Sequence, residues 1–245
     1  MIPYFLLFTI ILLLAGFEQI YDGPKIKPLV WLVGILLVAF AAFRPENIDK
    51  DYANYVNSFK QFEAPLDYFR YFDDWAFFEP LYYFIPSLLK TYFTTSYYIP
   101  LTFFLFAAFG VSLKLTGIGK LSNFFFLTVL CYFSHFYLLH EMTQIRAAIA
   151  SGSLLLLIPI VQKKKHLLAI LIIALTCLLH YSALFLLLLL FLNPTNSKPK
   201  LYWSLLGATL VLAFIDTSFV FSYLSFDLGP ITLKSTSYQT LTESG

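Results

Sequence analysis

The chain has few charged residues and few cysteines, and each shortage excludes a class of protein. Only 12% of its residues are Asp, Glu, Lys or Arg, whereas a soluble domain carries about 25%. No basic tract suited to nucleic acid is present, so we expect no nucleic-acid partner. The two cysteines, Cys131 and Cys177, lie inside apolar runs, which predicts small apolar side chains rather than a disulfide.

Chemical motifs of the common enzyme classes are also missing. No second His, Cys or carboxylate stands at metal-ligand spacing from His180, so we expect no metal site. The sequence has no glycine-rich loop that would cradle a nucleotide and no nucleophile-elbow pattern. These observations predict a protein without a cofactor.

Long apolar runs are what the sequence has instead. Its residues are 59% hydrophobic and 20% aromatic, and runs of about 20 apolar residues are typical of membrane-spanning helices. We predict an all-α polytopic membrane protein, with residues 1–245 as a single integral membrane domain. The first run has no basic segment before it and no cleavage site, which indicates a retained span. About seven spans are predicted, at residues 3–20, 29–43, 97–113, 124–139, 147–161, 167–192 and 202–221.

The sixth span is too long for a straight helix. Residues 167–192 would rise about 39 Å, against a hydrocarbon core of about 30 Å. The helix must therefore tilt, project from the membrane, or break near His180. A re-entrant pair of segments is the alternative for this region.

Two regions lie outside the predicted spans. Residues 44–95 are acidic and aromatic, which predicts an extracytoplasmic loop of short helices lying at the membrane surface. Glu79 followed by Pro80 is typical of a helix start. Residues 222–245 form a polar tail rich in Ser and Thr.

The placement of lysines predicts the orientation. Lys25 with Lys27, Lys114 with Lys120, and residues 163–165 fall in alternate loops, which the positive-inside rule assigns to the cytoplasm. The N-terminus and the 44–95 loop would then lie outside. Lys198 and Lys200 conflict with this orientation unless residues 167–192 are a re-entrant pair.

Ionisable residues beside or within apolar runs are the candidates for function, because such groups are costly at membrane depth. Arginine presents a fork of donors suited to phosphate, and a histidine can accept a proton near neutral pH. Each candidate also has a simpler interpretation, as an interfacial anchor, a solvated loop residue or a packed side chain. The candidates in chain order are Arg44, Asp51, Tyr52, Tyr55, Trp75, Glu79, His140, Gln144, Arg146 and His180.

Several of these residues occur in short motifs whose order resembles the EpsG family of polysaccharide polymerases, relatives of the Wzy O-antigen polymerases. The matching pieces are FRPENIDKDYANY, Glu79-Pro80, QIRAAIA at 144–150, a short basic loop, and LLHYSAL at 178–184. Two features depart from the family. Pro45 follows Arg44 where a glycine is usual, and family members usually continue through further spans, which predicts a C-terminally shortened member.

The resemblance implies an inverting glycosyltransferase on the outer face of the bacterial cytoplasmic membrane. It would move a growing glycan from undecaprenyl diphosphate onto a new lipid-linked repeat unit. Its partners would be the lipid-linked oligosaccharide, the bilayer, a flippase and a chain-length regulator. The implied catalytic residues are Arg146, His180, Asp51 and Glu79, and the implied substrate-binding residues are Arg44, Tyr52, Tyr55, Gln144, His140 and Trp75. The small residues at 147–153 allow either close helix packing or a groove for the lipid carrier.

Two other functions explain the same intramembrane charges. The first is a transporter or flippase for a polar or lipid-linked substrate, which would show paired interrupted helices in two related halves. That symmetry is not visible in the sequence. The second is an inactive, truncated scaffold.

Overall fold

The computed structural model describes residues 2–20, 27–45, 51–71, 78–191 and 199–213, and the elements in these ranges are all helices joined by short connections. The chain forms two compact units, one of residues 1–72 and 79–191, the other of residues 73–78 and 192–245. In the second unit the structure describes one helix, α11 (Pro199–Ala213), on which part of the predicted span 202–221 lies. The remainder of that span and the polar tail lie outside the described residues.

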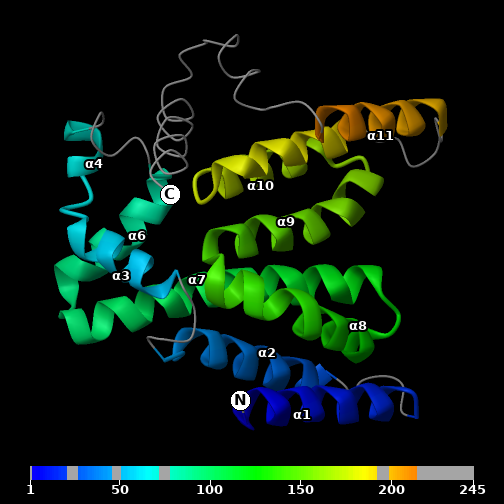
Figure 1. Cartoon of the computed structure of the whole chain (residues 1–245), viewed down its shortest axis with the longest axis horizontal. Coiled ribbons are helices and arrows are strands. Elements are labelled where there is room, and N and C mark those ends of the chain that lie inside the picture. The colour runs from blue at the N-terminus through cyan, green and yellow to red at the C-terminus, as the bar shows by residue number, and fades with distance from the viewer. Residues whose placement is uncertain (1, 21–26, 46–50, 72–77, 192–198, 214–245) are drawn as a thin grey trace. The chain divides into compact units, whose positions relative to one another are not determined.

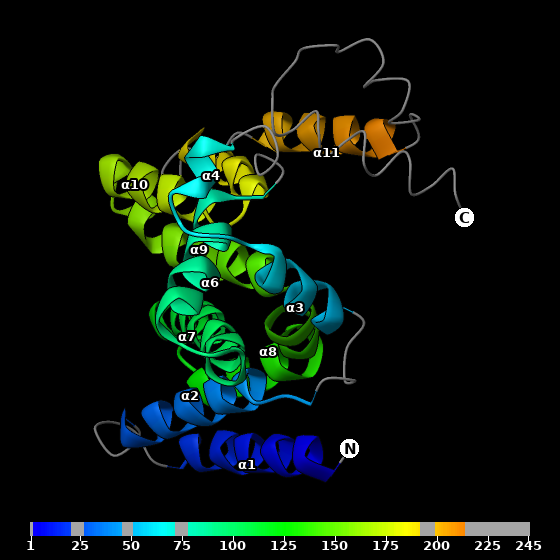
Figure 2. The same cartoon turned by 90° about the vertical axis from the view of Figure 1, so that its left-hand side faces the viewer.

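The first unit is a stack of apolar helices (Figures 1 and 2). Its elements in chain order are α1 (Ile2–Glu18), α2 (Lys27–Ala42), α3 (Tyr52–Gln61), α4 (Asp67–Arg70), α6 (Pro80–Tyr92), α7 (Thr95–Leu121), α8 (Phe125–Tyr132), the π-helix η1 (Phe133–Thr143), α9 (Ile145–Gln162), α10 (His166–Cys177) and the 3₁₀-helix η2 (Tyr181–Phe191). Within the described ranges, α7 and α9 are long and apolar enough to cross a membrane, and α1, α2, α10, η2 and α11 are shorter apolar helices.

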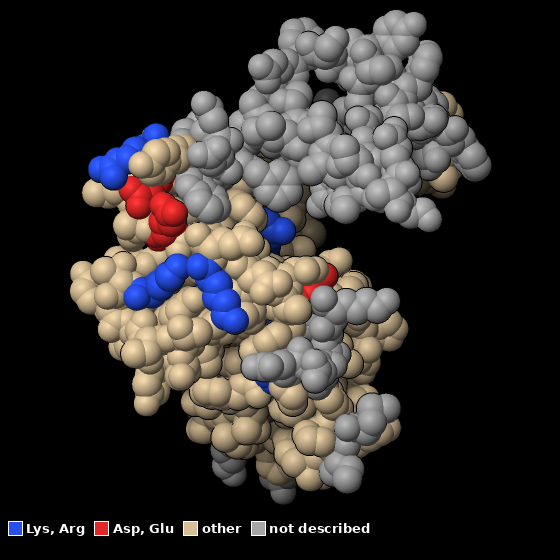
Figure 3. All heavy atoms as spheres, turned by 60° about the vertical axis from the view of Figure 1, so that its left-hand side comes forward, with Lys and Arg blue, Asp and Glu red and all other residues tan. Residues whose placement is uncertain are grey.

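The outside of this stack is apolar, as expected for a protein solvated by lipid. Large hydrophobic side chains are exposed along several helices, including Leu13 on α1, Trp31 on α2 and Phe185 on η2. Figure 3 shows one face on which few of the drawn atoms belong to charged residues. A contiguous apolar surface of this kind marks contact with a membrane or with another protein.

The interior is built from one face of each of five helices. Those helices are α1, α2, α7, α8 and η1, and their buried side chains include Ile11, Leu37, Val111, Val129 and Tyr137. The carboxylate of Glu18 at the end of α1 accepts hydrogen bonds from the backbone N–H groups of Phe125 and Phe126, at 2.7 and 2.8 Å. Because the first N–H groups of a helix have no partner within it, this contact caps α8.

Helices α7 and α9 run in the same direction and pack through glycines. Gly110 of α7 faces Ala148, and Gly117 faces Leu155. The buried small residues of α9, Ala148, Gly152 and Ser153, thus serve close helix packing. Of the two alternatives for this small-residue stretch, the structure shows close approach rather than a groove.

Gly117→Ala is expected to destabilise this contact by about 1–3 kcal/mol. A Cβ atom at position 117 would meet Leu155 Cβ at 2.6 Å and the Leu155 carbonyl carbon at 3.0 Å. The midpoint of thermal unfolding in detergent measures the effect. Gly16→Ala is the matched control, because no atom lies within 4 Å of a Cβ added there, and it should not lower the midpoint. Equal midpoints for both variants would contradict the close α7–α9 contact.

Short helices of the 44–95 region lie at the end of the stack where α7 begins (Figure 1). Phe59 of α3 and Tyr82 of α6 pack on Phe103 and Phe106 of α7. Lys90 of α6 donates to the carbonyls of Lys60 and Phe62, each at 2.7 Å, and so caps the end of α3. The predicted short helices are confirmed for the described part of this region, as is the helix start at Pro80.

The helical stack corrects two of the predicted segments. The third span does not end at Leu113, because α7 continues to Leu121 and carries Lys114 inside the unit rather than in a loop. The sixth span is not one helix. It breaks at His180, and η2 returns along α10 and α9, with Leu186, Leu187 and Leu190 packed near Val161 and Ala169.

The break at His180 matches the re-entrant alternative for this region. Val161 and Ala169 flank the turn that holds the exposed residues 163–165. Since η2 packs against them, the chain leaves η2 on the lysine-rich side of the unit. Lys198 lies outside the described residues, and Lys200 lies on α11 in the second unit.

Candidate functional site

A buried carboxylate, Glu79, lies at the centre of the candidate site. It is 0% exposed and directly precedes α6, with an extended backbone. Pro80 occupies the first helical position. An N–H group there would have no partner within the helix, so proline loses no hydrogen bond. The next N–H, that of Leu81, donates to the carbonyl oxygen of Leu178 at 2.8 Å. The start of α6 is therefore fixed against the break that follows α10.

Arg146 approaches Glu79 from the first turn of α9. Its NH1 donates to Glu79 Oε2 at 2.5 Å, and its guanidinium carbon lies 4.6 Å from the centre of the Tyr82 ring. Tyr55 on α3 lies close enough to the guanidinium group for its charge to oppose the rise in the pKa of the phenol. The Arg146 side chain retains 25% of its exposure, whereas Glu79 has none. Arg146 is thus held between the carboxylate and two rings while part of it reaches the surface.

His180 contacts the other carboxylate oxygen of Glu79. Its Nδ1 lies 3.3 Å from Glu79 Oε1, and the backbone N–H of Tyr181 donates to the same oxygen at 3.4 Å. The histidine sits at the break between α10 and η2, where its own N–H still donates to Thr176 at the end of α10. The break therefore turns the imidazole toward α6. The side chain is 24% exposed.

Tyrosines of the 44–95 region line the site and remain neutral. Burial raises the pKa of Tyr55, and the Arg146 charge opposes part of this rise. Burial also raises the pKa of Tyr68, and Tyr181, next to His180, raises it further. A phenol whose pKa is raised keeps its proton and can donate a hydrogen bond to an oxygen-rich ligand.

Two of the other predicted site residues, Arg44 and Tyr52, contact the Phe103 ring. Arg44 is buried, with its guanidinium carbon 4.3 Å from the Phe103 ring centre and 5.6 Å from that of Tyr52, and its NH1 donates to the backbone carbonyls of Ala41 and Glu141. Tyr52 stacks on Phe103. Arg44 is therefore enclosed by rings and carbonyls, although it remains close enough to Tyr55 to influence its pKa.

Three more predicted residues occupy the edges of this region. Asp51 immediately precedes α3, four residues before Tyr55 on the same helical face. Gln144 is exposed and has a non-helical backbone between η1 and α9. His140 turns toward α9, with Nδ1 3.3 Å from Ser151 Oγ. Trp75 lies outside the described residues.

Sequence reasoning missed a second polar cluster, made of Lys114, Tyr132 and Glu141. Lys114 was predicted in a cytoplasmic loop, but it is buried and paired with Glu141. The clue was the pair of glycines, Gly110 and Gly117, on either side of the lysine, because small residues allow another helix to approach closely. Both cysteines are free, and Cys131 is exposed rather than packed. Among the described residues, no three His, Cys, Asp or Glu side chains gather as a metal site would require.

Comparison with known proteins identifies a family for the chain. A search of curated proteins and a search of solved structures found no match. The EpsG family matches residues 27–244, a range that includes every residue of the candidate site. An exopolysaccharide polymerase-like function and a membrane location follow from this match and from the apolar helices. The chain belongs to the EpsG family.

Proposed function

We propose that this chain is an inverting glycosyltransferase that joins oligosaccharide repeat units carried on undecaprenyl diphosphate. The observation that carries the proposal is the double contact of Glu79, which bonds Arg146 through one oxygen and His180 through the other. A cation suited to phosphate and a base suited to a hydroxyl group are thereby held on one buried carboxylate. Polymerisation of lipid-diphosphate sugars needs both.

His180 has the geometry of a general base. Its Nδ1 faces Glu79, so the carboxylate favours the tautomer that carries the proton on Nδ1 and leaves the Nε2 lone pair for the substrate. The other nitrogen, Nε2, then accepts the proton of the acceptor hydroxyl as that oxygen attacks the anomeric carbon of the donor sugar. A positioned base of this kind contributes about 10²–10⁴-fold to a rate.

Arg146 stabilises the leaving group. When the new glycosidic bond forms, the bond between the anomeric carbon and the diphosphate oxygen breaks, and its electron pair goes to the lipid diphosphate. A guanidinium group has five N–H donors, and the bond to Glu79 uses one of them. Donors that face the departing diphosphate oppose the growing negative charge. Attack from the face opposite the leaving group inverts the sugar.

The lipid carrier needs an apolar surface near the site. A pocket of about 490 Å³ lies between the start of α1, the end of α2 and η1, and its lining includes Tyr4, Phe40, Phe43, Arg44 and Met142. It opens beside a buried arginine and is mostly apolar. This pocket supports a lipid path at the end of α2 rather than along the small residues of α9.

The site faces outward in this proposal, on the outer side of the bacterial cytoplasmic membrane. The start of α1 lies at the site end of the unit, where the Tyr4 hydroxyl contacts Met142 Sδ at 3.7 Å. The lysine-rich turn after α9 lies at the opposite end (Figure 1). The positive-inside rule then supports a cytoplasmic turn, an external site and an external N-terminus.

His180→Asn is the first test of the proposal. The amide can still hydrogen-bond Glu79, but the position of Nε2 is lost, so polymerisation should fall by about 10²–10⁴-fold. The assay uses purified protein in vesicles with a lipid-diphosphate-linked oligosaccharide and measures polymer length on gels. His166→Asn is the matched control, because His166 is exposed in the lysine-rich turn.

Three outcomes of this assay would contradict the proposal. Full activity of the His180 variant would show that His180 is not the general base. Flux of the substrate across the vesicle without glycan transfer would identify a transporter or flippase. An intact, folded wild-type chain with neither activity would identify a scaffold.

A further inference from the structure

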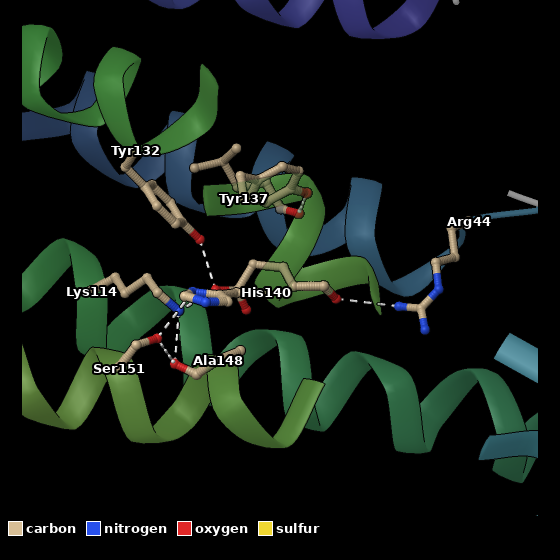
Figure 4. Close-up of polar contacts among 9 residues, drawn as sticks. Arg44, Lys114, Tyr132, Tyr137, His140, Ala148 and Ser151 are labelled. Atoms are coloured by element: carbon tan, nitrogen blue, oxygen red, sulfur yellow. Dashed lines mark hydrogen bonds and ion pairs between the residues drawn. The ribbon is translucent and has the colours of Figure 1, made fainter. Parts of the chain in front are cut away.

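A second buried ion pair joins Lys114 of α7 to Glu141 of η1 (Figure 4). Lys114 Nζ on α7 donates to Glu141 Oε1 at 2.5 Å and to the carbonyl oxygen of Ala148 at 2.7 Å. The hydroxyl of Tyr132 donates to the same Glu141 oxygen at 2.8 Å. Lys114 is 2% exposed and Glu141 is 1% exposed. One ammonium group therefore connects α7, η1 and α9.

This pair holds the bend between η1 and α9, defined here as residues 143–145. Glu141 lies just before the bend, and Ala148 lies in the first turn after it. Arg146 is in that same first turn. Arg44 reaches the bend from the end of α2, where its NH1 donates to the backbone carbonyl of Glu141 at 3.3 Å (Figure 4). The position of Arg146 is thus linked through the bend to Lys114.

The surroundings of the pair are shaped to admit the carboxylate. A Cβ atom at Gly110 would overlap Glu141 Oε2. A Cβ atom at Gly152 would meet Leu113 Cβ at 2.8 Å and the Gly110 carbonyl at 3.1 Å. Within the described part of the chain, Glu141 Oε2 has no hydrogen-bond partner. Buried ion pairs are a weak source of stability, because apolar replacements of both partners are often tolerated.

We propose that Lys114 and Glu141 are positioning residues that fix the η1–α9 bend and thereby hold Arg146 against Glu79. The proposal rests on the proposed function, in which Arg146 acts on the diphosphate. Lys114 and Glu141 are almost completely buried, so they act through the bend and not by binding substrate. They act by joining the two segments that meet at Gln144, and without them α9 can shift relative to α6.

The test replaces both partners at once with Lys114→Met and Glu141→Leu, so that no unpaired charge is left in the interior. Removal of one partner alone would leave an unpaired charge in the interior. The resulting loss of stability would obscure any effect on the position of Arg146. The double variant should fold with a thermal midpoint close to that of the wild type. Its polymerisation rate should fall at least tenfold.

A distance measurement supplies a readout that does not depend on activity. Spin labels are placed on cysteines at Gln144 and Tyr92, both exposed, after Cys131 and Cys177 are replaced by serine. The distance distribution between the bend and α6 should be narrow with the pair and broad or displaced without it. The control is Ser153→Ala with Thr176→Val, which removes a buried hydroxyl contact of 2.9 Å between α9 and α10. The control should leave the distribution narrow.

The outcomes separate this inference from the proposed function. An unchanged distance distribution in the double variant would overturn the positioning role, whatever the rate. A native polymerisation rate in the double variant would overturn it as well. If His180→Asn and Glu79→Gln are both fully active, the proposed function is wrong, and the distance distribution still decides whether the pair fixes the bend.

Discussion

Replacing Glu79 with Gln is expected to reduce polymerisation by about 10²–10⁴-fold, the largest loss we expect from an isosteric change. The amide keeps the shape of the carboxylate but loses its charge. His180 then has no anionic partner at Nδ1, and Arg146 loses its ion pair. His180 and Arg146 would both still be present, but Glu79 would no longer orient them. A base must keep one tautomer and one orientation to accept a proton efficiently.

The measurement for Glu79→Gln is the rate of chain extension with purified protein in vesicles. Glu63→Gln is the matched control, since Glu63 is exposed in the same region of the chain. The control should polymerise at the wild-type rate. If Glu79→Gln also did so while the protein remained folded, the carboxylate would have no part in the reaction, and the site would have to be sought elsewhere.

Replacing Arg146 with Ala is expected to lower the rate by about 10²–10³-fold, the range for loss of one charge-stabilising group in a transition state. The variant should also be less stable. Glu79 would be left fully buried without its cation, and removing one partner of a buried pair costs up to about 3–5 kcal/mol. Polymer length on gels measures the first effect, and the thermal midpoint in detergent measures the second.

Arg146→Lys separates the two roles of this arginine. Lysine keeps a positive charge for Glu79, so most of the stability should return. It lacks the planar fork that binds phosphate through two parallel bonds, so the rate should stay low. Arg70→Ala is the control, because Arg70 is an exposed arginine paired only locally with Asp67. Full activity of Arg146→Lys would show that charge alone suffices.

The positions of the helices were predictable where a long apolar run alone determines them. The apolar runs gave α1, α2 and α9 within a few residues, because about 20 apolar side chains leave few alternatives. The errors occur where a tertiary contact overrides the local pattern. Lys114 was predicted to end its helix, but Glu141 neutralises it in the interior. The pairing partner is 27 residues away in the sequence, and no local pattern reveals it.

The site was predictable by residue type more than by geometry. Arg146, His180 and Glu79 were all expected to matter, because each ionisable group is costly beside apolar helices. Arg146 and His180 both reach Glu79 because the chain breaks after α10. The excess length of the apolar run 167–192 indicated a break as one possibility, but it did not predict how the chain continues after it. The binding of Arg44 to the same substrate stays a prediction, and the structure adds that aromatic rings and backbone carbonyls surround its side chain. Side-chain direction of this kind is set by packing.

The order in which the chain is synthesised gives the Glu79 contacts a further consequence. Glu79 is made first, but its cation follows 67 residues later and its histidine partner 101 residues later. Burying a charged carboxylate without a partner is costly, so Glu79 stays exposed to water until its partners have been synthesised. The first turn of α6 can dock only after Arg146, Leu178 and His180 have left the ribosome. The site is therefore one of the last parts of the described unit to assemble.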